Sequence, residues 1–417
     1  MLYRFAWVLM WITFKIYFRR IDVIGLEKLE KDKPYILVAN HPASFLDAMV
    51  LAVFLKRDVH FYVRGDIFKH PLACRFLTWL HMIPIFGREH GMENVGKNYN
   101  TFERGKKLLQ QGKLLLIFPE GFSRLSKKVE PMKKGPARVA LQTAFEDGGL
   151  NNLSIQSVEL NYSHHGIRSD LFIRLGESLP LDHYAVVYKE LPAKAISMLT
   201  TDLTPFFKRN VIHVEDGNKT LVAEEVMRME FNDCMDKPST FFNQARLRCE
   251  KLDFKEDQVY DQYVEVLNQY KKLLHVHGLV DRSFSKNHPP HIMGLLNLLL
   301  TIEFYVLSKI FWFFPGKIAK WIADKTVTRI DFYTSVFTGV LAFTCLIWWL
   351  GWMIFVFQTD SIYFKASIVF SPFFAYIAVQ WENDFTDLKS DLILKNLKTT
   401  APSLVNQLEE MRSFLLS

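Results

Sequence analysis

The sequence predicts an α/β fold: a single mixed, mostly buried sheet flanked by helices, with an N-terminal interfacial helix and a C-terminal helical membrane region. Strand-like and helix-like segments alternate between residues 22 and 180, which is typical of an α/β layer. Of the 417 residues, 49% are hydrophobic, and the excess lies in residues 1–18 and near the C-terminus. The chain is therefore expected to combine an α/β domain with membrane-associated helices.

Residues 1–18 are apolar and aromatic, and they include Arg4 and Lys15. The segment has no small-residue cleavage site, which disfavours a signal peptide. It is also shorter than the roughly 20 apolar residues that a membrane span needs. We expect residues 1–21 to form an interfacial helix whose tryptophans lie near lipid headgroups. A single true span is the alternative.

The alternating region contains short apolar runs, which are typical of buried strands, between longer helical stretches. We expect strands at Tyr35–Ala39, Val59–Val63, Met82–Phe86, Lys113–Phe118, Ser154–Leu160 and Leu171–Leu175. We expect helices at Ser44–Leu55, Pro71–Leu80, Asn94–Gln111 and Gly135–Phe145. One α/β domain then covers residues 22–235, and a charged helical extension follows over residues 236–290.

Residues 291–382 form the predicted membrane region. Segments 336–357 and 362–380 are nearly free of charge and are joined by a very short turn, which predicts a transmembrane hairpin. The tail, residues 383–417, alternates charges and leucines and predicts an exposed, cytoplasmic amphipathic helix.

A third apolar segment, residues 293–325, could also cross the membrane. If it did, a basic stretch would be exported, against the positive-inside rule. That stretch carries Lys317, Lys320, Lys325 and Arg329. We therefore predict that residues 293–325 lie in or re-enter the cytoplasmic leaflet, and that the active site faces the cytoplasm.

The formal net charge is +7. A basic surface suits nucleic acid, anionic lipid headgroups or phosphorylated substrates. The membrane segments favour lipid over nucleic acid. The four cysteines are far apart, so neither a disulfide framework nor a zinc site is expected.

His41 and Asp47 lie at the junction between a predicted strand and the helix that follows it. An aspartate in the first helical turn can hold the Nδ1 of such a histidine, which leaves Nε2 free as a general base. In the alternative reading, Ser44 caps the helix and Asp47 only complements the helix dipole.

A second polar cluster follows another apolar strand. Glu120 and Gly121 lie at its carboxyl end, and Arg124 can grip a phosphate. Arg88 follows a third strand. Taken alone, the cluster is compatible with an ordinary turn, and each arginine is compatible with a solvated surface side chain. Together they bring a base and anion-binding groups to strand ends of one α/β unit, where sites form in such sheets.

With these motifs the chain resembles the glycerolipid acyltransferase family, which includes glycerol-3-phosphate and 1-acylglycerol-3-phosphate acyltransferases. The resemblance covers about residues 20–215. Asn40, His41 and Asp47 match the Asn-His-spacer-Asp motif. Phe118–Gly121 matches the Phe-Pro-Glu-Gly signature, and Arg88 matches the arginine after an Ile-Pro-Ile strand.

The resemblance implies a membrane-bound enzyme of phospholipid biosynthesis. It would transfer a fatty acyl group from acyl-CoA or an acyl carrier protein thioester to a hydroxyl of glycerol 3-phosphate or 1-acylglycerol 3-phosphate. His41 would be the general base and Asp47 its orienting group. No metal, and no cofactor beyond the thioester co-substrate, is implied. The acceptor-binding residues would be Arg88, Glu120, Gly121 and Arg124.

Four features depart from the family pattern. The spacer between His41 and Asp47 has five residues instead of four, as in a subgroup that resembles fungal glycerol-3-phosphate/dihydroxyacetone-phosphate enzymes and also carries C-terminal membrane segments. His81 stands where a glycine is common, Arg124 is displaced by one position, and Glu159 replaces a proline. Acylation of another lipid or lysophospholipid, and a non-catalytic lipid-binding protein, are therefore the alternatives.

Overall fold

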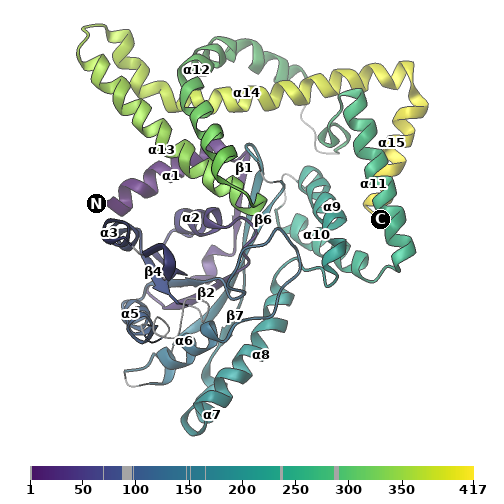
Figure 1. Ribbon diagram of the computed structural model, residues 1–417. Coiled ribbons are helices and arrows are strands. Elements are labelled where there is room, and N and C mark those ends of the chain that lie inside the picture. The colour runs from purple at the N-terminus through teal and green to yellow at the C-terminus, as the bar shows by residue number, and fades with distance from the viewer. Residues whose placement is uncertain are drawn as a thin grey trace.

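A seven-stranded mixed sheet lies at the centre of the computed structural model (Figure 1). The structure describes residues 2–68, 70–86, 96, 98–146, 148–150, 152–164, 166–234, 238–285 and 291–417. The strand order is β1-β7-β6-β2-β5-β3-β4, and among these neighbours only β6 and β7 are antiparallel. The strands are β1 (Arg20–Ile24), β2 (Tyr35–Ala39), β3 (Val59–Arg64), β4 (Met82–Ile85), β5 (Leu114–Ile117), β6 (Ser154–Tyr162) and β7 (Asp170–Pro180).

Helices cover both faces of this sheet. One face packs on α5 (Asn98–Gln110), α6 (Lys134–Phe145), α7 (Ala185–Glu190) and α8 (Pro192–Asn210). The other packs on α1 (Leu2–Tyr17) and α2 (Phe45–Phe54). The central strands β2 and β5 are buried at every residue, which is why their sequences are continuous apolar runs. The predicted α/β class with one mixed, buried sheet is confirmed.

Strand β1 was not predicted. It is only five residues long, carries an arginine and an aspartate, and pairs with a strand about 150 residues away. A short, half-exposed edge strand has no apolar run to reveal it, because its position depends on a distant partner. Strand β7 extends to Pro180, five residues beyond the predicted end, as the long antiparallel partner of β6.

His81 lies between α3 (Pro71–Trp79) and β4, where the family commonly has glycine. Its φ is 64°, in the left-handed region that favours glycine. Its ring stacks between His60 (centroids 4.2 Å apart) and Tyr3 of α1 (3.8 Å). Burial lowers the pKa of His60 to about 3 and also lowers that of His81. The neutral rings fix the start of α1 to the edge of the sheet.

Helices α10 (Pro238–Asp253) and α11 (Asp257–His277) of the helical extension share an apolar core with α15 (Pro402–Leu415). Helix α9 (Thr220–Asp233), which the prediction assigned to the α/β domain, packs in the same core. The prediction of an exposed tail is therefore wrong: Val405, Leu408 and Leu415 are buried in that core. Helix α15 is amphipathic, as predicted. The sequence does not show that other helices cover its apolar face.

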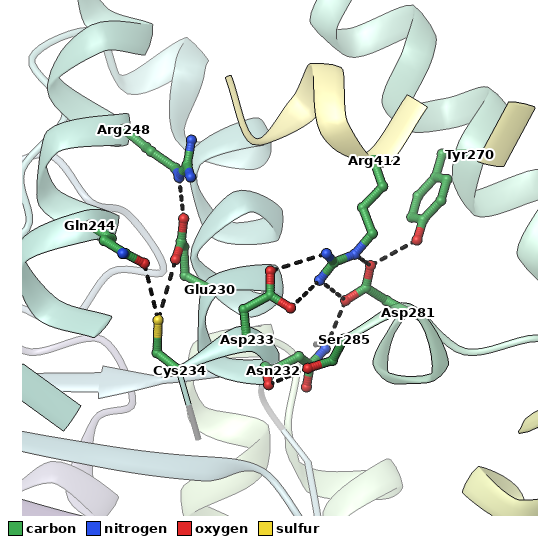
Figure 2. A network of polar contacts seen from close by, with 10 residues as sticks. All are labelled: Glu230, Asn232, Asp233, Cys234, Gln244, Arg248, Tyr270, Asp281, Ser285 and Arg412. Atoms are coloured by element: carbon green, nitrogen blue, oxygen red, sulfur yellow. Dashed lines mark hydrogen bonds and ion pairs between the residues drawn. The ribbon is translucent and has the colours of Figure 1, made fainter. Parts of the chain in front are cut away.

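Arg412 attaches the tail through two carboxylates (Figure 2). It makes two 3.0 Å hydrogen bonds to Asp233, and its Nε donates to Asp281 Oδ1 at 2.9 Å. The hydroxyl of Tyr270 also donates to Asp281, at 2.8 Å. Burial alone would raise the pKa of Asp281, but the Arg412 guanidinium lowers it below its usual value. The ion pair joins the last helix to the extension.

Three long helices make up the predicted membrane region: α12 (His291–Thr326), α13 (Ile330–Phe357) and α14 (Ile362–Thr400). Each is long and apolar enough to cross a membrane, by length and composition. In Figure 1, α13 and the first part of α14 extend away from the sheet at the upper left, and α14 then runs across the molecule to α15. These helices suggest that the protein associates with membranes.

Candidate active site

His41 follows β2, and its ring pairs with Asp47 in the first turn of α2. The Nδ1 atom of His41 lies 2.9 Å from Asp47 Oδ2. The five-residue spacer therefore does not prevent the two side chains from meeting. An Nδ1–H donated to this carboxylate leaves the Nε2 lone pair free, as a general base requires.

Two further groups hold the Asp47 carboxylate, which is fully buried. The Ala43 backbone N–H donates to Oδ2 at 2.8 Å, and the Tyr162 hydroxyl donates to Oδ1 at 2.7 Å. Burial, and next the Asp47 carboxylate, raise the pKa of Tyr162 well above its ordinary value, so its hydroxyl stays protonated and donates. The arrangement is a buried Tyr162–Asp47–His41 chain of hydrogen bonds, and the sequence had not assigned Tyr162 a role.

Three neighbouring strands supply these groups at one edge of the sheet. Tyr162 ends β6, His41 follows β2, and Phe118 follows β5; the three strands are parallel and adjacent. The Phe118 ring stacks on the imidazole of His41 with centroids 3.7 Å apart. The Asn40 amide exchanges two 2.8 Å hydrogen bonds with the backbone of Leu160, which ties the end of β2 to β6. These contacts fix the position of the imidazole.

Glu120 and Gly121 lie in the loop after β5. Burial raises the pKa of Glu120 to about 7, although the Glu130 backbone N–H donates to this carboxyl. A carboxyl with such a pKa changes charge near neutral pH, a property common at functional sites. Gly121 has φ 76°, and a Cβ there would lie 2.6 Å from Lys133 Nζ. The absence of a side chain lets this ammonium group approach the backbone of the loop.

The two predicted arginines are placed differently. The Arg124 backbone N–H donates to the His41 carbonyl at 3.2 Å. Its side chain, however, is 60% exposed, lies over the Phe122 ring and pairs with Glu130 at 2.8 Å. Arg88 lies outside the residues that the structure describes.

Helix α13 reaches the loop that carries His41. The Ser335 hydroxyl donates to the Ala43 carbonyl, and it accepts the Leu46 backbone N–H at 3.1 Å. Arg329, just before α13, donates to the Ser123 carbonyl at 3.2 Å. These contacts join residues 206 to 292 positions apart in the sequence, so no local pattern could have revealed them. The membrane region is therefore in direct contact with the candidate active site.

Glu159 lies on the other face of β6 from Val158 and Leu160, and it is fully buried. Its Oε1 accepts the Ile212 backbone N–H at 2.8 Å. Burial raises its pKa. The residue that replaces the family's proline thus contacts the segment after α8 and points away from the His41 face of the sheet. Among the described residues, no cluster of three or more histidine, cysteine or acidic side chains could hold a metal ion.

The sequence matches the family model described as acyltransferase over residues 20–158. This segment contains β1 to β5, the His41–Asp47 pair and the Phe118–Gly121 loop. The match to the acyltransferase family thus covers about a third of the chain and includes the candidate site.

Two proteins named as acyltransferases are similar in sequence to this segment. A chloroplastic 1-acyl-sn-glycerol-3-phosphate acyltransferase of Brassica napus is 28% identical over 136 residues, which is 32% of this chain and 38% of that protein. A 1-acyl-sn-glycerol-3-phosphate acyltransferase of Chlamydomonas reinhardtii is 33% identical over 132 residues, 31% of this chain and 37% of that protein. The chain thus matches less than two fifths of the length of either relative.

A solved structure was also found. The 1-acyl-sn-glycerophosphate acyltransferase PlsC from Thermotoga maritima aligns with a TM-score of 0.32 and 18% identity, over 48% of this chain and 80% of that chain.

Proposed function

We propose that this chain is a membrane-bound O-acyltransferase of phospholipid biosynthesis. It transfers a fatty acyl group from an acyl thioester to the free hydroxyl of 1-acylglycerol 3-phosphate, with glycerol 3-phosphate as the alternative acceptor. The observation that carries the proposal is the His41–Asp47 pair, 2.9 Å apart at the carboxyl end of β2. The two relatives named for acylation of 1-acylglycerol 3-phosphate support this acceptor.

The reaction is a direct transfer. His41 Nε2 takes the proton of the acceptor hydroxyl, and the oxygen attacks the thioester carbonyl carbon. The tetrahedral intermediate collapses as the carbon–sulfur bond breaks, and His41 returns the proton to the leaving thiolate. Asp47 stabilises the imidazolium that forms between these two steps, because its carboxylate accepts the Nδ1–H.

Glu120, Gly121 and Lys133 form the acceptor side of the site in this proposal. The ammonium of Lys133, close above Gly121, attracts the acceptor's phosphate. The ionised Glu120 accepts a hydrogen bond from an acceptor hydroxyl. Arg124 and Arg88 keep their proposed phosphate-binding roles; for Arg124 this requires that the guanidinium leave Glu130 when the acceptor binds.

The contacts of α12 support the proposal that it enters the membrane and returns. Its first half runs antiparallel to α14. Asn297 donates to Asp384 at 3.1 Å, and Trp312 donates to the Ser371 carbonyl at 3.2 Å. Later residues of α12 contact earlier residues of α14, so the two segments are antiparallel. Helix α12 therefore runs from the catalytic side towards the turn at residues 358–361.

The second half of α12 returns beside α13. Thr344 donates to the Pro315 carbonyl at 3.3 Å, and the Tyr333 hydroxyl donates to Asp324 at 2.6 Å. At 1.5 Å per residue, Thr344 is about 21 Å along α13, so Pro315 lies near the middle of that helix. A proline removes a helical hydrogen bond and permits a bend there. Both ends of α12 then lie on the catalytic side, and only α13 and α14 cross.

In this topology the basic residues 317–329 stay on the side of the active site, which the positive-inside rule makes cytoplasmic. A reporter that distinguishes the two sides, fused after residue 326, is expected to give the same cytoplasmic signal as one fused after residue 285, before α12. A periplasmic or lumenal signal at position 326 would overturn this part of the proposal.

The activity is tested with purified full-length protein in detergent. The assay follows free thiol release from acyl thioesters, with 1-acylglycerol 3-phosphate, glycerol 3-phosphate and uncharged lysolipids compared as acceptors. His41→Ala is expected to lose about 10²–10⁴-fold in kcat, the usual contribution of a general base. His277→Ala, at the end of α11 and outside the site, is the matched control.

Two results would contradict the proposal. If His41→Ala kept more than about a tenth of wild-type turnover, the general-base assignment would fail. If the wild-type protein bound lysolipid tightly but released no thiol with any acceptor, the non-catalytic alternative would replace the enzymatic one. A preference for an uncharged lysolipid would replace the phosphate-bearing acceptor.

A further inference from the structure

Helix α3 presents its more apolar face to the outside of the protein. Leu72, Phe76 and Trp79 are 78%, 50% and 47% exposed, and their spacing puts them on one face of the helix. A scattered exposed leucine needs no explanation, but a contiguous row of large apolar side chains marks a contact surface.

Helix α1 continues this surface. Phe5, Val8 and Trp11 are its exposed apolar residues, also on one face. The two helices meet where Tyr3 stacks on His81, directly after α3. We call the six exposed side chains the apolar rim; they are Phe5, Val8, Trp11, Leu72, Phe76 and Trp79.

The rim adjoins the helices that enter the membrane. Tyr17, the last residue of α1, hydrogen-bonds to Thr334 and Thr338 in the first turns of α13. The rim is therefore continuous with the membrane helices at the level where α13 begins. In Figure 1, α1 lies between α13 and α3.

The charges on the two helices that form the rim are of one sign. Neither α1 nor α3 contains an acidic residue, whereas Lys15 lies 5.9 Å from the ring of Trp11 and Arg75 lies 4.9 Å from that of Trp79. Tryptophan paired with a long cationic side chain is suited to the headgroup layer, where an apolar body meets a polar, often anionic surface.

We propose that the apolar rim inserts into the headgroup and upper acyl layer of the leaflet on the catalytic side, with α3 as a second membrane contact beside α1. The acyltransferase segment would then lie against the bilayer along one sheet edge as well as being tethered to it by α13 and α14. The exposed Phe45 at the start of α2 lies within the same contact, next to the His41 loop. An acyl chain could reach the site without crossing water.

The test is photo-crosslinking of the full-length protein in vesicles of phosphatidylcholine and anionic phosphatidylglycerol. A benzophenone amino acid replaces Phe76, a conservative change that should keep the fold. The same label at Ile354 of α13 is the lipid-facing reference, and at Phe254, 89% exposed after α10, the aqueous reference. The readout is lipid adduct per protein, which does not depend on catalysis or on the proposed acyltransferase function.

The expected adduct at position 76 is comparable with that at position 354 and roughly tenfold above that at position 254, as for a side chain held among acyl chains. An adduct no higher than at position 254 would overturn the proposal. So would a crosslinked dimer of this chain, or an adduct with another protein, in place of the lipid adduct at position 76.

Discussion

Replacing Tyr162 with phenylalanine tests whether the buried hydrogen-bond chain behind His41 contributes to catalysis. The change removes only the hydroxyl that donates to Asp47 Oδ1 at 2.7 Å, in a residue that is 6% exposed. A hydrogen bond to a charged group is worth about 1.5–3 kcal/mol. Asp47 keeps two other donors, from Ala43 and His41, and both bind Oδ2. Oδ1 is therefore the oxygen that loses its partner.

We expect the loss to appear in kcat. A carboxylate free to rotate no longer holds the Nδ1–H of His41 in line, so the imidazolium of the transition state is less well stabilised. If about 1.4 kcal/mol of the hydrogen bond acts on the transition state, kcat falls about tenfold. The KM for the acceptor should hardly change, because the Tyr162 hydroxyl contacts Asp47 and is not among the proposed acceptor-binding groups. The assay is thiol release at saturating and limiting acceptor.

Tyr188→Phe provides the matched control. Tyr188 is also 6% exposed and also donates to a carboxylate, that of Glu146 at 2.9 Å, but on the other side of the sheet. Tyr162→Phe should lower thermal stability more, because Asp47 is buried whereas Glu146 is exposed and can bind water instead, and only Tyr162→Phe should lower kcat. The reasoning fails if Tyr162→Phe keeps its kcat within about twofold, or if both variants lose the same turnover.

Three further predictions follow from contacts outside the catalytic pair. Ser335→Ala removes the hydroxyl that links α13 to Ala43 and Leu46, and should lower kcat about fivefold without loss of membrane insertion; Ser371→Ala, whose hydroxyl bonds within its own helix, should not. Arg412→Ala removes the cation that Asp233 and Asp281 share and should cost about 3–5 kcal/mol in thermal unfolding, against under about 0.5 kcal/mol for the partly exposed Arg246→Ala. Because burial raises the pKa of Glu120 to about 7 and its ionised form accepts the acceptor's hydroxyl, kcat/KM should rise with pH through about 7, and Glu120→Gln should make this rise less steep. Unchanged turnover in Ser335→Ala, no loss of stability in Arg412→Ala, or an unaltered pH profile in Glu120→Gln would refute the corresponding argument.

The parts of the fold that could be predicted from sequence are those with a local cause. Strands β2 and β5 are buried on both faces, so all their residues are apolar. The resulting continuous apolar runs can be recognised in the sequence. His41 and Glu120 could be brought together because each follows such a strand, and adjacent parallel strands end at the same edge. The burial of Val405 and Leu408 could not be predicted, since the partner helices lie far away in sequence.

The same distinction applies within the site. The pairing of His41 with Asp47 is a local event across six residues, and the motif indicated it. Tyr162 and Ser335 reach the same loop from 115 and 292 residues away, and each is an ordinary residue for its own element. A tyrosine at a strand end and a serine in an apolar helix carry no signal of a partner. Only the sheet order and the docking of α13 bring them to the site.

The five-residue spacer is accommodated by a strained turn. Ser44 has φ 53° and ψ −129°, which is the conformation of the first central residue of a type II′ turn and is favourable for glycine. The Leu46 backbone N–H closes this turn on the Ala43 carbonyl at 3.2 Å. Such a backbone conformation costs about 1–3 kcal/mol and persists only when the surrounding residues hold it.

Two serine side chains hold this turn. Ser123 accepts the Ser44 backbone N–H at 3.1 Å, and Ser335 bridges the two ends of the turn. The extra residue is thus absorbed before α2 begins, and the group that completes the turn comes from the membrane region. In this chain the five-residue spacer and helix α13 are therefore coupled, because Ser335 of α13 supplies the contact that holds the strained turn.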